Sequence, residues 1–84
     1  MIQDTEEHSM GNHRLDATGL NCPLPVLKTK KFLRNMKSGE ILEVLCTDPG
    51  SQKDFSAFCN QTGNVLIESK QQDGIYKYLI KNTE

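Results

Sequence analysis

Hydrophobic residues follow two periods along the first half of the chain, and each change of period marks a predicted element. Alternation over residues 13–18, with Leu15 and Ala17 on one face, predicts a short strand. Residues 23–36 carry apolar side chains at helical spacing, which predicts a helix whose inward face is Val26, Thr29, Phe32, Leu33 and Met36. The nearly continuous apolar run at 40–47 predicts a strand that is central in its sheet or buried on both sides.

The second half contains a further helix and then a hairpin. Asp48 and Pro49 are typical of a helix start, with Asp48 as the cap and Pro49 in the first helical position. This helix is expected to end at Gly63, and its inward side chains are Phe55, Phe58 and Cys59. A third strand begins at 65–67, and the turn at 73–74 leads into a fourth strand with alternating Tyr76, Tyr78 and Ile80.

The order of these elements predicts the fold class. Strand, helix, strand, helix, strand, strand is typical of an α/β two-layer sandwich with a mixed four-stranded sheet. Right-handed crossovers place both helices on one face if the first three strands extend the sheet suitably. Residues 1–12 are polar, acidic and without periodicity, so we expect a disordered acidic tail followed by a single domain at 13–84.

The length of the chain and its cysteines limit the classes of function that it can have. A chain of 84 residues has a modest core, so its chemistry is expected at the surface. No apolar run is long enough for a membrane span and no signal segment is apparent, which predicts a cytoplasmic protein without a membrane partner. The three cysteines form no C-x-x-C pair and match no common zinc spacing, and His8 and His13 have no paired ligand, so we expect reduced thiols, no metal and no cofactor.

Positive charge is concentrated on the first predicted helix. Five of the ten residues at 28–37 are basic and none is acidic; they are Lys28, Lys30, Lys31, Arg34 and Lys37. Because the net charge is −1, the remainder of the chain carries −6. This asymmetry suggests that Lys28, Lys31 and Arg34 bind an acidic partner surface, although a solvated helix face would have the same composition.

The chemistry is predicted at Cys22-Pro23-Leu24-Pro25, where the first strand gives way to the first helix. Prolines are tolerated in the first helical turn, which has no intrahelical use for their N–H groups. Pro23 in the first helical position would make Cys22 the N-cap, with its sulfur near the N–H of Leu24 and the positive end of the helix dipole. The dipole, helped by Lys28, is then expected to lower the thiol pKa and favour an anionic sulfur. Cysteine is a poor cap compared with Ser, Thr, Asp or Asn, so a functional thiol is the better interpretation.

The segment from Leu15 to Pro25 closely resembles the signature L-D-x-x-G-x-x-C-P-x-P of the TusA/SirA-like sulfur carriers. The resemblance continues through Asp48-Pro49 and Phe58-Cys59 and covers the chain apart from the acidic tail. It implies the β-α-β-α-β-β sandwich and a sulfurtransferase that carries a persulfide on Cys22 without a complete catalytic cycle of its own. It further implies a cysteine desulfurase as donor and a downstream relay protein as acceptor, toward 2-thiolation of the tRNA wobble uridine. One departure is Leu24, where relatives in the tRNA relay tend to have an acidic residue, so a different sulfur or selenium pathway stays open.

Several other residues have plainer predicted roles, and two other classes of function compete with this hypothesis. Asp16 is expected to hydrogen-bond the backbone of the active loop rather than to act as a base, and Pro23 and Pro25 to orient the thiol. Cys46 is interpreted as a buried apolar residue, and Cys59 as an inward-facing one with a resolving-thiol role as the alternative. A nucleic-acid-binding module and a non-catalytic regulatory module are the competing classes. The net charge and the few aromatic residues, mostly assigned to the core, argue against direct nucleic-acid binding.

Overall fold

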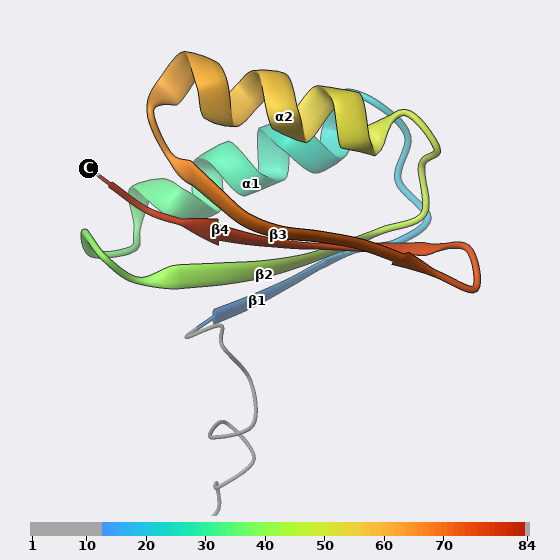
Figure 1. The fold of residues 1–84 in the computed structure, drawn as a ribbon, viewed down its shortest axis with the longest axis horizontal. Coiled ribbons are helices and arrows are strands. Elements are labelled where there is room, and N and C mark those ends of the chain that lie inside the picture. The colour runs from blue at the N-terminus through green and yellow to red at the C-terminus, as the bar shows by residue number, and fades with distance from the viewer. Residues whose placement is uncertain (1–12, 84) are drawn as a thin grey trace, which may run out of the picture.

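The computed structural model describes residues 13–83, in which two helices cover one face of a four-stranded sheet (Figure 1). In chain order the elements are β1 (His13–Ala17), α1 (Leu24–Arg34), β2 (Ile41–Cys46), α2 (Ser51–Thr62), β3 (Val65–Gln72) and β4 (Ile75–Lys81). The predicted two-layer α/β sandwich is therefore confirmed. The tail predicted at 1–12 lies outside the described residues.

The sheet is mixed, with strand order β1-β2-β4-β3. Strands β1 and β2 are parallel, and β4 is antiparallel to both of its neighbours. The turn of the β3–β4 hairpin has positive φ at both Asp73 (53°) and Gly74 (80°), the conformation that a two-residue hairpin requires. Because β4 folds back between β2 and β3, β2 becomes a central strand, as its apolar run predicted.

The core lies between the helices and the sheet. Leu42, Val44 and Cys46 alternate along β2 toward the helices and are fully buried. Across this layer Phe55 stacks on Tyr78 with ring centroids 4.7 Å apart. The buried Tyr78 hydroxyl is 2.6 Å from the Ser51 hydroxyl, which satisfies both polar groups. The periodicity of both strands and helices thus produces one continuous core.

Both helices begin later than their sequence predicts. The first helical residue of α1 is Leu24, and its N-cap is Pro23 rather than Cys22. Helix α2 begins at Ser51 with Gly50 as N-cap, and Asp48 makes no side-chain cap bond to it. The predictions of Cys22 and Asp48 as caps are therefore wrong. The physical reason is a competing partner for the Asp48 carboxylate, described below with the site.

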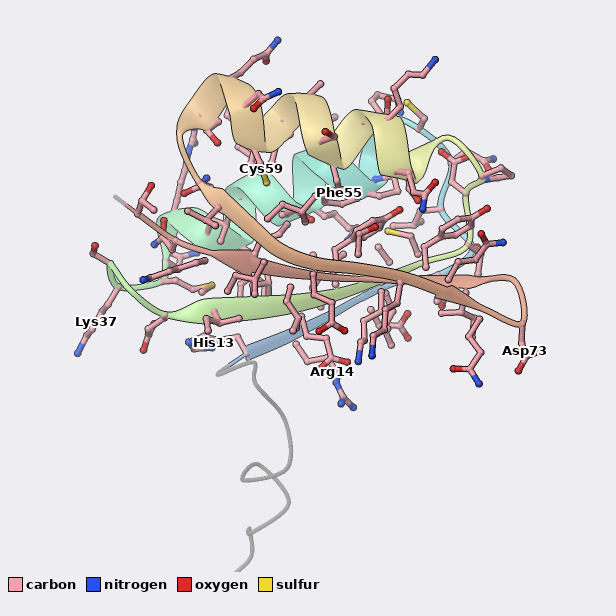
Figure 2. The ribbon with its side chains drawn as sticks, in the orientation of Figure 1. His13, Arg14, Lys37, Phe55, Cys59 and Asp73 are labelled. Atoms are coloured by element: carbon pink, nitrogen blue, oxygen red, sulfur yellow. The ribbon has the colours of Figure 1, made fainter. Side chains whose placement is uncertain are left out.

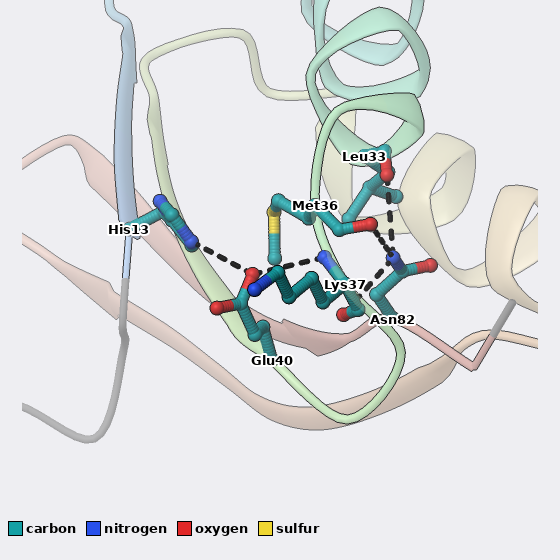
Figure 3. A network of polar contacts seen from close by, with 6 residues as sticks. All are labelled: His13, Leu33, Met36, Lys37, Glu40 and Asn82. Carbon is teal, nitrogen blue, oxygen red and sulfur yellow. Dashed lines mark hydrogen bonds and ion pairs between the residues drawn. The ribbon is translucent and has the colours of Figure 1, made fainter.

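The C-terminal end of α1 is capped by a residue from the other end of the domain. Asn82 follows β4 and is only 2% exposed. Its side-chain Nδ2 donates to the carbonyls of Leu33 at 3.2 Å, Met36 at 3.0 Å and Lys37 at 3.3 Å (Figure 3). Its own backbone N–H donates to the Glu40 carbonyl at 2.8 Å. This clamp satisfies carbonyls that a helix end leaves without intrahelical partners.

Replacing Asn82 with Ala should destabilise the domain by about 2 kcal/mol, because the hydrogen bonds of a buried side chain to three carbonyls are lost. Urea denaturation followed by circular dichroism measures this loss. The matched control is Asn60→Ala, at an exposed position of α2, which should change the free energy of unfolding by less than about 0.5 kcal/mol. Equal effects of the two substitutions would contradict the structural role given to Asn82.

Candidate functional site

Cys22 lies in the loop that connects β1 to α1 and its side chain is exposed. Because β1 and β2 are parallel neighbours, this loop and the β2–α2 loop emerge at the same edge of the sheet. Two hydrogen bonds join them: the Gly19 N–H donates to Thr47 Oγ1 at 2.8 Å, and the Cys22 N–H donates to Asp48 Oδ2 at 3.1 Å. The backbone of the cysteine is therefore held by the neighbouring crossover.

The start of the same loop is shaped by Asp16. Its Oδ1 accepts hydrogen bonds from the Thr18 backbone N–H at 3.0 Å and from the Thr18 hydroxyl at 2.6 Å. These two hydrogen bonds hold the pKa of the Asp16 carboxyl below its ordinary value, and the bond from the hydroxyl has the larger effect. Gly19 follows with φ of 81°, which only glycine adopts without strain. Asp16 thus organises the turn that precedes Cys22.

The expected contact between Cys22 and the start of the helix is not formed. The Leu24 N–H donates to the Asn21 carbonyl at 2.9 Å, so it is already used. Pro23 follows Cys22 through a cis peptide bond, and Pro25 occupies the second helical position with a fully buried side chain. The two prolines lie at the strand–helix junction as predicted. The helix itself begins at Leu24, one residue later than predicted.

The thiol of Cys22 faces carboxylates rather than the helix end. Its sulfur and carboxylate oxygens of Asp48 and Asp54 all lie within 4.8 Å of one another. The hydrogen bond to Asp54 is the largest cause of a thiol pKa raised above its ordinary value, followed by desolvation and by the negative charges of Asp54 and Asp48. The prediction of a lowered pKa, helped by Lys28, is therefore wrong. Asp54 was missed because nothing in its local sequence relates it to Cys22.

These three side chains lie close enough together to surround a cation, yet their positions have other causes. The Asp48 carboxylate accepts the N–H groups of Cys22 at 3.1 Å and Gly50 at 3.4 Å. Asp54 is positioned by the first turn of α2. The fold thus accounts for the positions of both carboxylates, and we assign no metal to them.

The other two cysteines are buried and free. Cys46 is at 0% and Cys59 at 5% exposure, and Cys59 points from α2 toward the sheet (Figure 2). Desolvation raises the pKa of each thiol to about 11. Burial also places Cys59 inside the core, where a resolving thiol would not meet a partner protein. The structure therefore leaves Cys22 as the accessible sulfur among the three.

The exposed face of α1 combines positive charge with apolar surface. Lys28, Lys31 and Arg34 are exposed and follow one another at intervals of three residues along the helix. Leu24 and Leu27, which are 46% and 52% exposed, lie on the same side of the helix. We call these five residues the basic face. Leu27 was not predicted as part of this face, because it lies outside the apolar stripe that predicts the buried side of the helix and no motif contains it.

Fold and site together define a small α/β domain that exposes one thiol at a strand–helix junction. The family model described as sulfurtransferase TusA matches residues 13–82. The sulfur carrier protein TusA of Allochromatium vinosum is 57% identical over 72 residues, which are 86% of this chain and 95% of that protein. A putative sulfur carrier protein of Neisseria meningitidis serogroup A is 48% identical over 73 residues, 87% of this chain and 99% of the relative.

A crystal structure of a SirA-like protein from Desulfitobacterium hafniense superimposes with a TM-score of 0.74 at 27% identity, and the match covers 86% of this chain and 99% of that one. The chain belongs to the TusA family of sulfurtransferases. Its general role is accordingly that of a sulfur carrier.

Alkylation should distinguish the three thiols by their burial. Iodoacetamide at pH 8 is expected to add one alkyl group to the native protein, at Cys22, because the thiolate is the reacting form and Cys46 and Cys59 are shielded. In denaturant all three cysteines should react. Intact mass and peptide mapping provide the measurement, with Cys22→Ser as the control that gains nothing when native. Labelling of Cys59 at a rate similar to Cys22 would show that the core thiol is accessible after all.

Proposed function

We propose that Cys22 accepts sulfur as a persulfide from a cysteine desulfurase and passes it to a downstream relay protein, toward 2-thiolation of the tRNA wobble uridine. The observation that carries this proposal is the placement of Cys22. It is the exposed cysteine of the three, and its backbone is fixed by Asp48 from the adjacent loop. A sulfur carrier needs a thiol that two different proteins can reach in turn, and an open loop at the sheet edge meets that need.

The transfer is a thiol–persulfide exchange. The Cys22 thiolate attacks the terminal sulfur of the donor persulfide, a new S–S bond forms at Cys22, and the S–S bond of the donor breaks. The donor cysteine leaves with the electron pair of the broken bond, and the proton lost by Cys22 compensates it directly or through solvent. One persulfide and one thiol enter and one of each leaves, so the exchange needs no external oxidant. Pro23 and Pro25 support it by limiting the directions in which Cys22 can point.

The basic face is the proposed docking surface for these partners. Leu24 and Leu27 supply apolar area at the start of α1, and Lys28, Lys31 and Arg34 continue the same face with positive charge. Apolar anchors within a charged rim are typical of protein–protein interfaces. An acidic partner surface with an apolar centre would complement it. Leu24 in place of an acidic residue makes this centre more apolar, and a partner from another sulfur or selenium pathway would be selected through the same position.

Direct nucleic-acid binding is less well supported. Among residues 13–83 every phenylalanine and tyrosine is buried or half-buried, so none offers an open ring for base stacking.

Neither helix in this part of the chain is long and apolar enough to cross a bilayer. We propose that the carrier acts in the cytoplasm, where reduced thiols persist.

Incubation with a cysteine desulfurase and cysteine should increase the intact mass by about 32 Da, the mass of one sulfur atom, and a reductant should remove it. The Cys22→Ser protein should gain nothing, because the attacking sulfur is absent. Cys46→Ser and Cys59→Ala are the matched controls and should load like the parent protein. Loading of Cys22→Ser would transfer the carrier role to another cysteine and refute this assignment.

Reversal of charge tests the basic face. The double variant Lys31→Glu/Arg34→Glu should reduce the second-order rate constant of loading roughly tenfold or more at low salt, because electrostatic steering is lost. The fold should be unchanged, since both side chains are exposed. The control is Lys70→Glu/Lys81→Glu, which reverses the same charge on β3 and β4. If both double variants load at the parent rate, Lys31 and Arg34 are only solvent-exposed residues of the helix and do not take part in docking.

A further inference from the structure

The carboxylates around Cys22 oppose the chemistry that the proposed function asks of it. Thiol–persulfide exchange proceeds through the thiolate, and negative groups beside a sulfur disfavour that form. Here Asp54 on α2 and Asp48 in the preceding loop face the sulfur, with all three donor atoms within 4.8 Å. No cation of α1 offsets them, although α1 carries the basic face. An exposed loop does not require acidic residues next to its thiol. We therefore ask what the two carboxylates do to the reactivity of Cys22.

We propose that Asp54 restrains Cys22: its carboxylate, within 4.8 Å of the sulfur, keeps the thiol of the free carrier unreactive, and sulfur exchange begins when docking of a transfer partner separates the two side chains. The inference rests on the proposed function, since it assumes that Cys22 is the sulfur carrier. It adds a positioning residue that lies outside the Cys-Pro-x-Pro element, on the second helix. It also explains how a carrier with an exposed thiol avoids exchange with unrelated thiols and electrophiles.

The contact between Cys22 and Asp54 has the geometry for such a restraint. Asp48 is occupied by the backbone N–H groups of Cys22 and Gly50, so it fixes the loop and contributes its charge from a constant position. Asp54 is half-buried on the first turn of α2, and its carboxylate lies within 4.8 Å of the sulfur. Moving the thiol away from this one carboxylate frees the sulfur without unfolding the loop. A partner on the basic face of α1 would contact the Cys22 loop next to it and displace the thiol from Asp54.

The same restraint acts on outgoing sulfur. When an acceptor thiolate takes the terminal sulfur, Cys22 leaves as a thiolate, and a leaving group of higher pKa leaves more slowly. The carboxylate of Asp54 beside the leaving sulfur therefore slows release to small thiols. A loaded carrier would retain its sulfur in the presence of glutathione. A docked acceptor would move Cys22 away from Asp54 and so allow the sulfur to be released. Loading and unloading are thus controlled by one contact.

The test compares alkylation of free parent protein and Asp54→Asn by iodoacetamide across the pH range. The variant should react roughly threefold faster or more at pH 7, with its profile shifted to lower pH, because one pKa unit changes the thiolate fraction about tenfold. Asp54→Glu, which keeps the charge, should remain closer to the parent. Asp73→Asn, at the exposed hairpin tip, is the matched control and should coincide with the parent. Coincident profiles for Asp54→Asn and parent would overturn the proposal.

Desulfurase loading then separates a restraint from a catalytic base. Under the proposal, Asp54→Asn loads at saturating desulfurase with a kcat equal to or above that of the parent, and the loaded variant loses sulfur to glutathione faster. A loss of kcat despite faster alkylation would mean that Asp54 assists the transfer, and would overturn the restraint. The proposed function fails on a different result, loading of Cys22→Ser, so the two failures are distinguishable.

Discussion

The arrangement of the site depends on one hydrogen bond, from the Cys22 N–H to the Asp48 carboxylate. It joins the loops that follow two neighbouring parallel strands, and a parallel pair always brings such loops to one edge of the sheet. Once Asp48 is engaged there, it no longer caps α2, and the helix begins at Ser51 instead. That start places Asp54 beside the thiol. The position of Cys22, the beginning of α2 and the environment of the sulfur therefore follow from a single contact.

Charge of opposite sign lies on the two sides of Cys22. The basic face of α1 extends away from it on one side, and Asp48 and Asp54 adjoin the sulfur on the other. The net charge of −1 conceals this separation. In the proposed function and the proposed restraint, two tasks are divided between two helices: α1 would recruit a partner and α2 would control the reactivity of the sulfur. A carrier that visits several proteins benefits when recruitment and reactivity are set by different residues.

Local periodicity predicted the strands and helices within one or two residues, and the Cys-Pro-x-Pro element singled out Cys22, the exposed thiol of the three, because both signals lie in adjacent residues. The two helix N-caps and the direction of the Cys22 pKa shift were predicted wrongly, whereas the end of α2 at Gly63 was predicted correctly. Asp48-Pro49-Gly50 satisfies the local rule for a helix start, but the rule does not include the Cys22 N–H as a competing donor. Asp54 and the Asn82 clamp depend on which segments become neighbours in space, and that is decided by the strand order rather than by any short motif.

Strand β4 is the last strand of the domain and yet pairs on both sides, with β2 and with β3. During synthesis, β1, α1 and β2 therefore leave the ribosome before the strand that completes their sheet exists, and α1 lacks the Asn82 donor at its end. Long-range pairing of this kind delays folding until late in the chain. The sheet that holds the Cys22 loop next to Asp48 and Asp54 is therefore complete only when β4 has inserted between β2 and β3.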